Sequence, residues 1–224
     1  MGIGMTLSLL SGIFWTIVYI DGIRVGIRDK SFAIPIWALG LNIAWEFLHF
    51  MLGLQAAGWA AQVVINLVWF LLDIGLVYTY FRYGRKYFPK SLKPSLFYAW
   101  GILVLTVSFI VQLAFILEFS LVFAATFAAY LQNLLMSVLF ITMLVSRGSS
   151  EGQSMLIAVC KFLGSLAPTI SIGILGSSMF GGTIIFVLII GLLMAFFDLV
   201  YIWMLAKMNQ GEKTMAMKVR ESAP

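Results

Sequence analysis

Long apolar segments alternate with short polar ones along almost the whole chain. A helix needs about 20 predominantly apolar residues to cross a bilayer, and seven segments qualify. They are Met5–Gly22, Phe32–Leu54, Trp59–Phe81, Pro94–Leu117, Ser120–Ser146, Ser154–Leu175 and Gly182–Ala206. Polar clusters and glycines, as in RYGRKYFPKSLKP, separate them. The pattern predicts an all-α membrane protein, a seven-transmembrane-helix bundle.

Composition supports the same fold class. Of the 224 residues 62% are hydrophobic and only 10% charged, whereas a soluble domain carries roughly 25% charged residues. We therefore expect a single transmembrane domain over residues 1–206, with the lipid bilayer as its surroundings and no nucleic acid as partner. Residues 207–224 are polar and are expected to form a disordered tail.

The positions of the basic residues predict the orientation of the bundle. Of the 14 Lys and Arg residues, all but Lys161 fall in the first, third and fifth loops or in the tail. Because cytoplasmic loops are enriched in Lys and Arg, this places the N-terminus outside and the C-terminus in the cytosol. The membrane would be the endoplasmic reticulum in a fungus and the inner or plasma membrane in a bacterium.

Four ionisable side chains lie at depth within the apolar segments: Glu46, Asp73, Lys161 and Asp198. Each costs ~3 kcal/mol to insert, so such groups usually face a cavity or a partner. At ~1.5 Å rise per residue, Asp73, Lys161 and Asp198 lie roughly 10–12 Å from the cytosolic helix ends, and Glu46 roughly 20 Å. We expect Asp73 and Lys161 to be neighbours in a supporting ion pair. The alternative is that Lys161 extends to the cytosol while Asp73 hydrogen-bonds to Tyr or Asn.

Helical spacing shows which residues accompany each acid, because residues three, four and seven apart share a face. The candidate substrate-binding residues found in this way, or at a matching depth, are Asn42, Trp45, His49, Trp69, Phe70, Asp73, Gln132, Asn133, Lys161 and Tyr201. For Gln132 and Asn133 the alternative is hydrogen bonding between helices. For His49 it is anchoring at the outer interface. Together the faces predict a mostly apolar, aromatic-lined chamber with few acids.

Several short motifs carry a resemblance to a known family. N-x-x-W-E-F in the second segment, W-x-x-x-D in the third and F-D-x-x-Y in the seventh resemble the integral membrane terpene cyclases. These enzymes belong to fungal meroterpenoid and indole-diterpene pathways and have bacterial relatives. The resemblance implies protonation of a terminal epoxide, or an alkene, on a hydrophobic prenylated substrate, followed by polyene cyclisation. It also implies that Glu46 and Asp198 are the catalytic acids.

The residues suit that chemistry on physical grounds. A carboxyl group in an apolar pocket tends to stay protonated and can act as a general acid. Aromatic faces stabilise a carbocation, and Trp45, Trp69, Phe70 and Tyr201 are the nearest candidates. We expect Glu46 and Asp198 to face one chamber and to deliver the proton together. The chain has no D-D-x-x-D motif that would hold magnesium for diphosphate ionisation, so neither a metal nor a cofactor is expected.

A carrier is the competing interpretation. Small seven-helix carriers can consist of two parallel three-helix repeats around a linker helix. WFLLDIGLVY weakly resembles MAFFDLVY, and under such a repeat Asp73 would correspond to Asp198. A retinal-type photoreceptor is disfavoured, because the last apolar segment lacks the lysine needed for a Schiff base.

Overall fold

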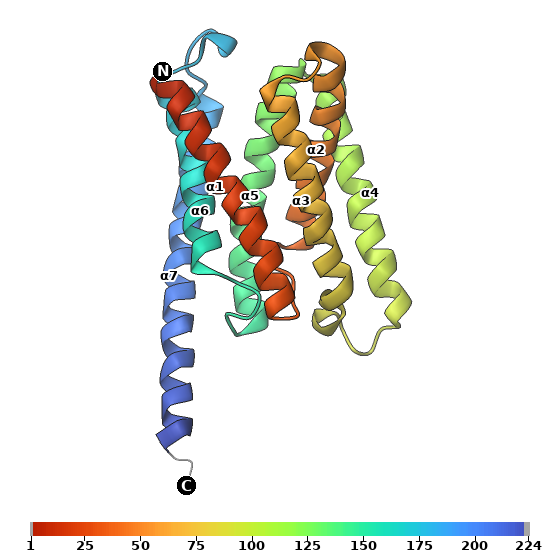
Figure 1. Ribbon diagram of the computed structural model, residues 1–224, viewed down its shortest axis with the longest axis vertical. Helices are drawn as coiled ribbons and strands as arrows, with labels where there is room; N and C mark the ends of the chain where they lie inside the picture. The colour runs from red at the N-terminus through yellow and green to blue at the C-terminus, as the bar shows by residue number, and fades with distance from the viewer. Residues whose placement is uncertain (1, 222–224) are drawn as a thin grey trace.

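The computed structural model describes residues 2–221, with side chains for residues 2–218. Seven of its helices are long and apolar enough to cross a membrane. They are α1 (Ile3–Arg28), α2 (Ile36–Ala57), α3 (Ala61–Tyr83), α4 (Pro94–Glu118), α5 (Leu121–Arg147), α6 (Met155–Pro168), which continues as a π-helix over Thr169–Ile174, and α7 (Ile185–Glu221). Figure 1 shows them side by side, with the two chain ends at opposite ends of the bundle. The predicted all-α seven-helix fold is confirmed, and the described residues form no β-strand.

Proline and glycine mark several helix ends. Pro94 is the first residue of α4, where the N–H group it lacks would have no helical partner. Gly148 ends α5 in the left-handed conformation, with φ at 60°, which costs glycine little. Pro168 ends α6, and the wider π-helical turn that follows is of a kind often found at functional sites.

The last helix extends well beyond the predicted apolar segment. α7 continues to Glu221, so residues 207–221 are helical where a disordered tail was expected, and residues 222–224 lie outside the described part of the chain. Figure 1 shows this extension projecting from the bundle. Most of the side chains described in this extension are exposed. A polar sequence does not by itself end a helix, because each added residue contributes a hydrogen bond once a helix has started.

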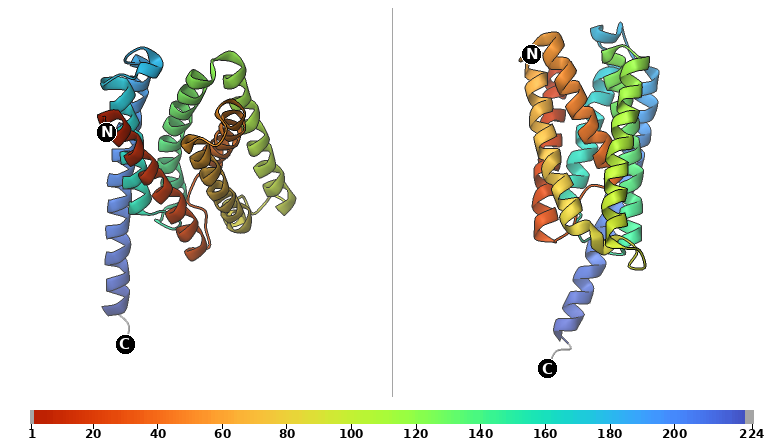
Figure 2. Two further views of the ribbon diagram at one scale, coloured as in Figure 1. Left: turned by 45° about the horizontal axis from the view of Figure 1, so that its top comes forward. Right: turned by 90° about the vertical axis from the view of Figure 1, so that its right-hand side faces the viewer.

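Six helices form a closed ring. Neighbouring pairs in the ring are α1 with α3, α3 with α2, α2 with α5, α5 with α7, α7 with α6, and α6 with α1. α4 packs against α2 and α5 from outside, at one edge of the molecule in both Figure 1 and the left view of Figure 2. The helices of the first half follow the order α1, α3, α2 around the ring, and those of the second half follow the order α5, α7, α6. The same packing order therefore occurs twice.

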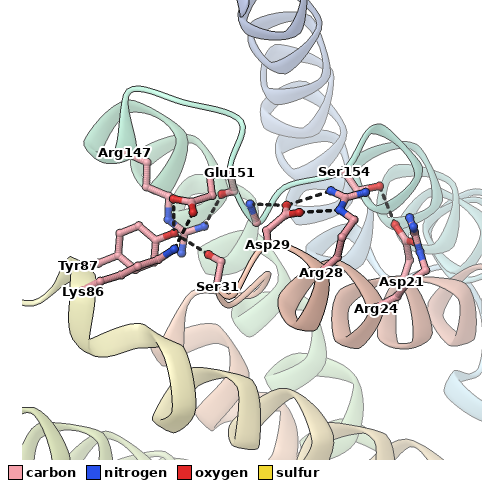
Figure 3. A network of polar contacts seen from close by, with 11 residues as sticks. Asp21, Arg24, Arg28, Asp29, Ser31, Lys86, Tyr87, Arg147, Glu151 and Ser154 are labelled. Atoms are coloured by element: carbon pink, nitrogen blue, oxygen red, sulfur yellow. Dashed lines mark hydrogen bonds and ion pairs between the residues drawn. The ribbon is translucent and has the colours of Figure 1, made fainter.

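Polar side chains tie together the three loops at the end that carries the C-terminus (Figure 3). Arg147 donates to the Phe32 carbonyl at 3.0 Å, and its guanidinium lies over the rings of Phe32 and Tyr87 at 4.4 and 4.2 Å. Lys86 Nζ and the Tyr87 hydroxyl donate to the two carboxylate oxygens of Glu151, at 2.6 and 2.8 Å. The first, third and fifth loops are thereby held in one arrangement.

Two carboxylates of this network have perturbed pKa values. Asp29 accepts hydrogen bonds from Arg28 Nη2 at 2.9 Å and from the Gly152 N–H at 3.0 Å. The hydrogen bonds from Arg28 are the main reason that the pKa of Asp29 lies below its ordinary value. Partial burial acts to raise the pKa of Glu151. Hydrogen bonds from Lys86 and Tyr87, together with the positive charges of Lys86 and Arg147, lower it by more. Both groups therefore favour the ionised form in the folded protein.

Candidate active site

A cavity of about 570 Å³ lies inside the ring of helices. Its lining comes from α1, α2, α3, α5, α6 with its π-helical continuation, α7 and the connection before α7, but not from α4. Along α2 it extends from Asn42 to Ala57, towards the end of the bundle that carries the N-terminus. Seven of the predicted site residues line it: Asn42, Trp45, Glu46, His49, Trp69, Gln132 and Asn133. An apolar cavity with a few polar groups is typical of a site for a hydrophobic small molecule.

Glu46 is the one acidic residue among those that line the cavity. Its side chain is buried, with 2% of the residue exposed. Oε1 accepts a long hydrogen bond of 3.4 Å from the Tyr19 hydroxyl, and Oε2 has no partner in the described residues. None of the ion pairs between described residues includes Glu46. Burial without a cation disfavours the ionised form of a carboxyl group, so this environment suits a protonated acid.

Several aromatic rings line the same cavity as the acid. The ring centroids of Trp15 and Tyr19 are 6.3 Å apart, and those of Tyr19 and Trp69 are 5.9 Å apart. Trp45 stacks on His49 at 4.4 Å. The indole N–H groups of Trp45 and Trp69 each donate to a protein oxygen at 3.0 Å. Because these donors are already bound, both tryptophans offer the cavity apolar surface and π-electron density, with no free donor.

The expected pairing of Asp73 with Lys161 is wrong. Lys161 Nζ lies 2.7 Å from Asp198 Oδ1 and donates to Ser137 Oγ at 2.6 Å. Asp73 Oδ2 instead accepts from Asn42 Nδ2 at 2.9 Å, and its other oxygen has no partner in the described residues. The estimated depths were equal for Asp73 and Asp198. Depth alone could not decide between them, because it does not say in which direction each helix face points.

Asp198 also differs from expectation. It is buried together with Lys161, and neither residue belongs to the lining of the cavity. Met194, one helical turn earlier on α7, does line it. Glu46 and Asp198 thus do not face one chamber in this structure. Asp198 lies beside the cavity in a salt bridge.

The salt bridge has a counterpart in the first half of the molecule. Tyr19 and Ser137 lie at the same distance along the chain from the first residues of α1 and α5. Asn42 and Lys161 correspond in the same way in α2 and α6. Asp73 and Asp198 occupy matching places in WFLLD and MAFFD. In each half a nitrogen on the middle helix donates both to the hydroxyl of the first helix and to the aspartate of the third.

Two aromatic residues predicted to belong to the site, Phe70 and Tyr201, do not line the cavity. Phe70 packs against Phe47, with 5.2 Å between ring centroids. The Tyr201 hydroxyl donates to Gln153 Oε1 at 2.9 Å, and its ring lies 5.1 Å from that of Phe140. Phe70 shares a helix with Trp69 but points along a different face, because adjacent residues in a helix diverge by about 100°.

Several lining residues were not predicted, among them Trp15 and Tyr19 on α1, and the hydroxyl of Tyr19 contacts Glu46. Their spacing of four residues places both on one helix face, and that signal was available. The only acidic residue of the first apolar segment is Asp21, next to its predicted cytosolic end, so no ionisable residue at depth drew attention to this face. Ser165 on α6, buried and with an unpartnered Oγ, was also missed. A single serine in an apolar helix gives no distinct signal.

The fold and cavity define an integral membrane protein with an acid-bearing hydrophobic site. Residues 2–211 match the family of Pyr4-like transmembrane terpene cyclases, and the chain belongs to that family. The resemblance seen in the sequence motifs is therefore confirmed. Membership of this family also disfavours the carrier interpretation, although the repeated packing order around the ring agrees with the weak echo between the third and seventh apolar segments.

Similar proteins include three fungal terpene cyclases. Pyr4-family terpene cyclase mfmH of Annulohypoxylon moriforme is 48% identical over 80 residues, which is 36% of this chain and 32% of the relative. Terpene cyclase adrI of Penicillium rubens is 30% identical over 170 residues, 73% of this chain and 66% of the relative. Terpene cyclase pyr4 of Aspergillus fumigatus is 26% identical over 165 residues, 73% of this chain and 68% of the relative. The matches thus span about a third of mfmH and about two thirds of the other two. No solved structure matches the chain significantly.

Proposed function

We propose that the protein is a membrane-embedded terpene cyclase in which Glu46 protonates the terminal epoxide, or an alkene, of a prenylated substrate. The observation that carries the proposal is the buried carboxyl group of Glu46, which lines a tryptophan-rich cavity and has one oxygen without a partner among residues 2–218. Family membership supports cyclase chemistry. The apolar lining supports a hydrophobic substrate.

The proposed reaction is an isomerisation. The Glu46 proton passes to the epoxide oxygen as the carbon–oxygen bond breaks and leaves a carbocation. Neighbouring alkenes attack the cation in turn, each forming a carbon–carbon bond, until one proton is lost from carbon. The proton gained equals the proton lost, so the product has the mass of the substrate. Aromatic faces stabilise the passing cation, and a dry cavity delays its capture by water.

We propose a supporting role for Asp198 in this reaction. Its salt bridge with Lys161 joins α7 to α6, two neighbours in the ring around the cavity. Its carboxylate is bound by the Lys161 ammonium group and does not line the cavity, so it is not placed to donate a proton to a bound substrate. Glu46, which has no cation partner among the described residues, is the better candidate for the acid.

The test uses membranes that contain the protein and an epoxidised prenylated phenol or polyketide. We expect a cyclised isomer of unchanged mass, detected by chromatography and mass spectrometry. Glu46→Gln keeps the size and polarity of the side chain but removes the transferable proton, so turnover should fall by about 10²–10⁴-fold. Glu118→Gln, at the exposed end of α4, is the matched control and should cyclise like the wild type. Near wild-type turnover in Glu46→Gln would show that another group is the acid.

A further inference from the structure

We infer that a one-way chain of hydrogen bonds, from Gln112 through Gln132 and Asn42 to Tyr19, holds the proton of Glu46 on Oε2. Tyr19 and Asn42 are then positioning residues for the acid. The inference rests on the proposed role of Glu46 and adds which of its two oxygens delivers the proton. It depends on the order of donors and acceptors in a buried network that spans α4, α5, α2 and α1.

The direction of the chain is set at its first member. Gln112 Nε2 donates to the backbone carbonyl of Leu41 at 3.1 Å and to Gln132 Oε1 at 2.6 Å. A backbone carbonyl can only accept, so the nitrogen of Gln112 must be the atom at this position. The oxygen of Gln132 therefore points to Gln112, and its nitrogen points away.

Asn42 accepts one hydrogen bond of the chain and donates two. Gln132 Nε2 donates to Asn42 Oδ1 at 3.3 Å, which turns the amide nitrogen of Asn42 to the opposite side. That nitrogen donates to the Tyr19 hydroxyl at 2.5 Å and to Asp73 Oδ2 at 2.9 Å. Both of its N–H groups are used, so the amide of Asn42 has one orientation that satisfies all its partners.

The hydrogen bond that Tyr19 accepts from Asn42 determines that Tyr19 donates to Glu46. Its oxygen already accepts from Asn42, so its hydrogen must go to another acceptor, and Glu46 Oε1 at 3.4 Å is the one that the described residues supply. A protonated carboxyl group has one accepting carbonyl oxygen and one donating hydroxyl. With Oε1 engaged as acceptor, the proton resides on Oε2, the oxygen that none of the described residues binds.

The same hydrogen bond helps the acid lose its proton. After transfer, Glu46 is a carboxylate, and the bond from Tyr19 becomes charge-assisted and stronger. An interaction that strengthens as the proton leaves lowers the barrier without tightening substrate binding. We therefore expect Tyr19→Phe to reduce kcat about tenfold to a hundredfold with little change in KM.

The experiment measures the infrared absorption of the protonated Glu46 carboxyl group. Infrared spectra of the full-length protein in lipid should contain a protonated-carboxyl band that Glu46→Gln removes. In Tyr19→Phe this band should move to higher wavenumber, because its carbonyl loses a hydrogen bond. Tyr201→Phe removes a buried tyrosine hydroxyl outside the cavity lining and should leave the band in place.

The outcomes separate the two proposals. An unmoved band in Tyr19→Phe overturns the inference, and so does a spectrum in which Glu46→Gln removes no such band. A shifted band without cyclisation of any prenylated epoxide supports the inference and counts against the proposed function. If Tyr19→Phe does not fold, Gln112→Met serves instead. It frees the amides of Gln132 and Asn42 to turn, so the Glu46 band should broaden or shift, and an unchanged band would again overturn the inference.

Discussion

Lys161 Nζ lies 2.7 Å from Asp198 Oδ1, and both side chains are almost completely buried. The ammonium group also donates to Ser137 Oγ at 2.6 Å. Two opposite charges removed from water stabilise each other, but each becomes costly when its partner is absent. The pair and Ser137 link α5, α6 and α7. We therefore expect the loss of one charged partner to destabilise the folded protein more than the loss of both.

This relationship predicts a pattern of stabilities. Lys161→Met alone and Asp198→Leu alone should each lower the free energy of unfolding by about 3–5 kcal/mol, because each leaves a buried charge without its partner. The double variant should be close to the wild type. Unfolding in detergent, followed by circular dichroism, measures the difference. Equal stability of the single and double variants would contradict a buried ion pair.

The double variant also tests the role of Asp198 in catalysis. If Asp198 only supports the cavity, the folded double variant should still cyclise a prenylated epoxide at a measurable rate. The assay compares the product formed per folded molecule with that of the wild type. A variant that folds normally but makes no product would show that Asp198 or Lys161 takes a direct part in the reaction.

The ring of Trp69 is expected to stabilise a carbocation intermediate. Trp69→Leu should reduce turnover by about twofold to thirtyfold, matching a cation–π contribution of about 0.5–2 kcal/mol, and should release more partly cyclised product. Trp69→Phe loses the hydrogen bond to Thr16 as well but keeps a ring, so its loss should be smaller. Trp203→Leu, at an exposed position on α7, is the control. Equal losses in the Leu and Phe variants would assign the effect to that hydrogen bond.

The loop network should make stability depend on acid pH. Asp29 and Glu151 have lowered pKa values in the folded protein, against ordinary values of 3.8 and 4.5. Their contribution is thus fully present above the ordinary values and is lost as pH falls through the lowered ones. The thermal midpoint should drop over that range, and less steeply in Asp29→Asn with Glu151→Gln. An equally steep drop in this double variant would place the acid sensitivity elsewhere.

The orientation of the bundle can be tested by cysteine labelling. The native thiol of Cys160 is buried and should give little background. In intact bacterial cells that produce the protein, a membrane-impermeant maleimide should label Ser178→Cys, between α6 and α7. It should label Lys90→Cys, between α3 and α4, only after lysis. This is the result expected from the distribution of Lys and Arg. The opposite result would reverse the bundle in the membrane.

Hydropathy located all seven helices, but it placed some of their ends wrongly. The first apolar segment ends at Gly22, whereas α1 continues to Arg28 and so includes Arg24 and Arg28 as well. Arg24 pairs with Asp21 one turn earlier, so the polar residues do not end the helix. As in α7, each added residue contributes a further hydrogen bond once the helix has started.

Part of the site followed from spacing along one helix. Spacing along α2 predicted a shared face for Asn42, Glu46, His49 and Phe50. The first three line the cavity, and Phe50 does not. Contacts between helices were harder to predict, because they depend on the rotation of each helix about its axis. The pairing of Lys161 and the participation of Gln112 both depend on such rotations. Neither could be read from the rise per residue.

The position of α4 outside the ring has a consequence for the direction of the chain. Every crossing of the membrane reverses that direction, so three helices followed directly by three more would begin the second set from the opposite side. One extra crossing restores the starting side, and α4 provides it while contributing nothing to the cavity lining. The two halves can then stand parallel and be related by rotation about an axis along the membrane normal. Apart from Gln112, which donates to Leu41 and Gln132, α4 is needed because it makes the number of crossings before the second half even.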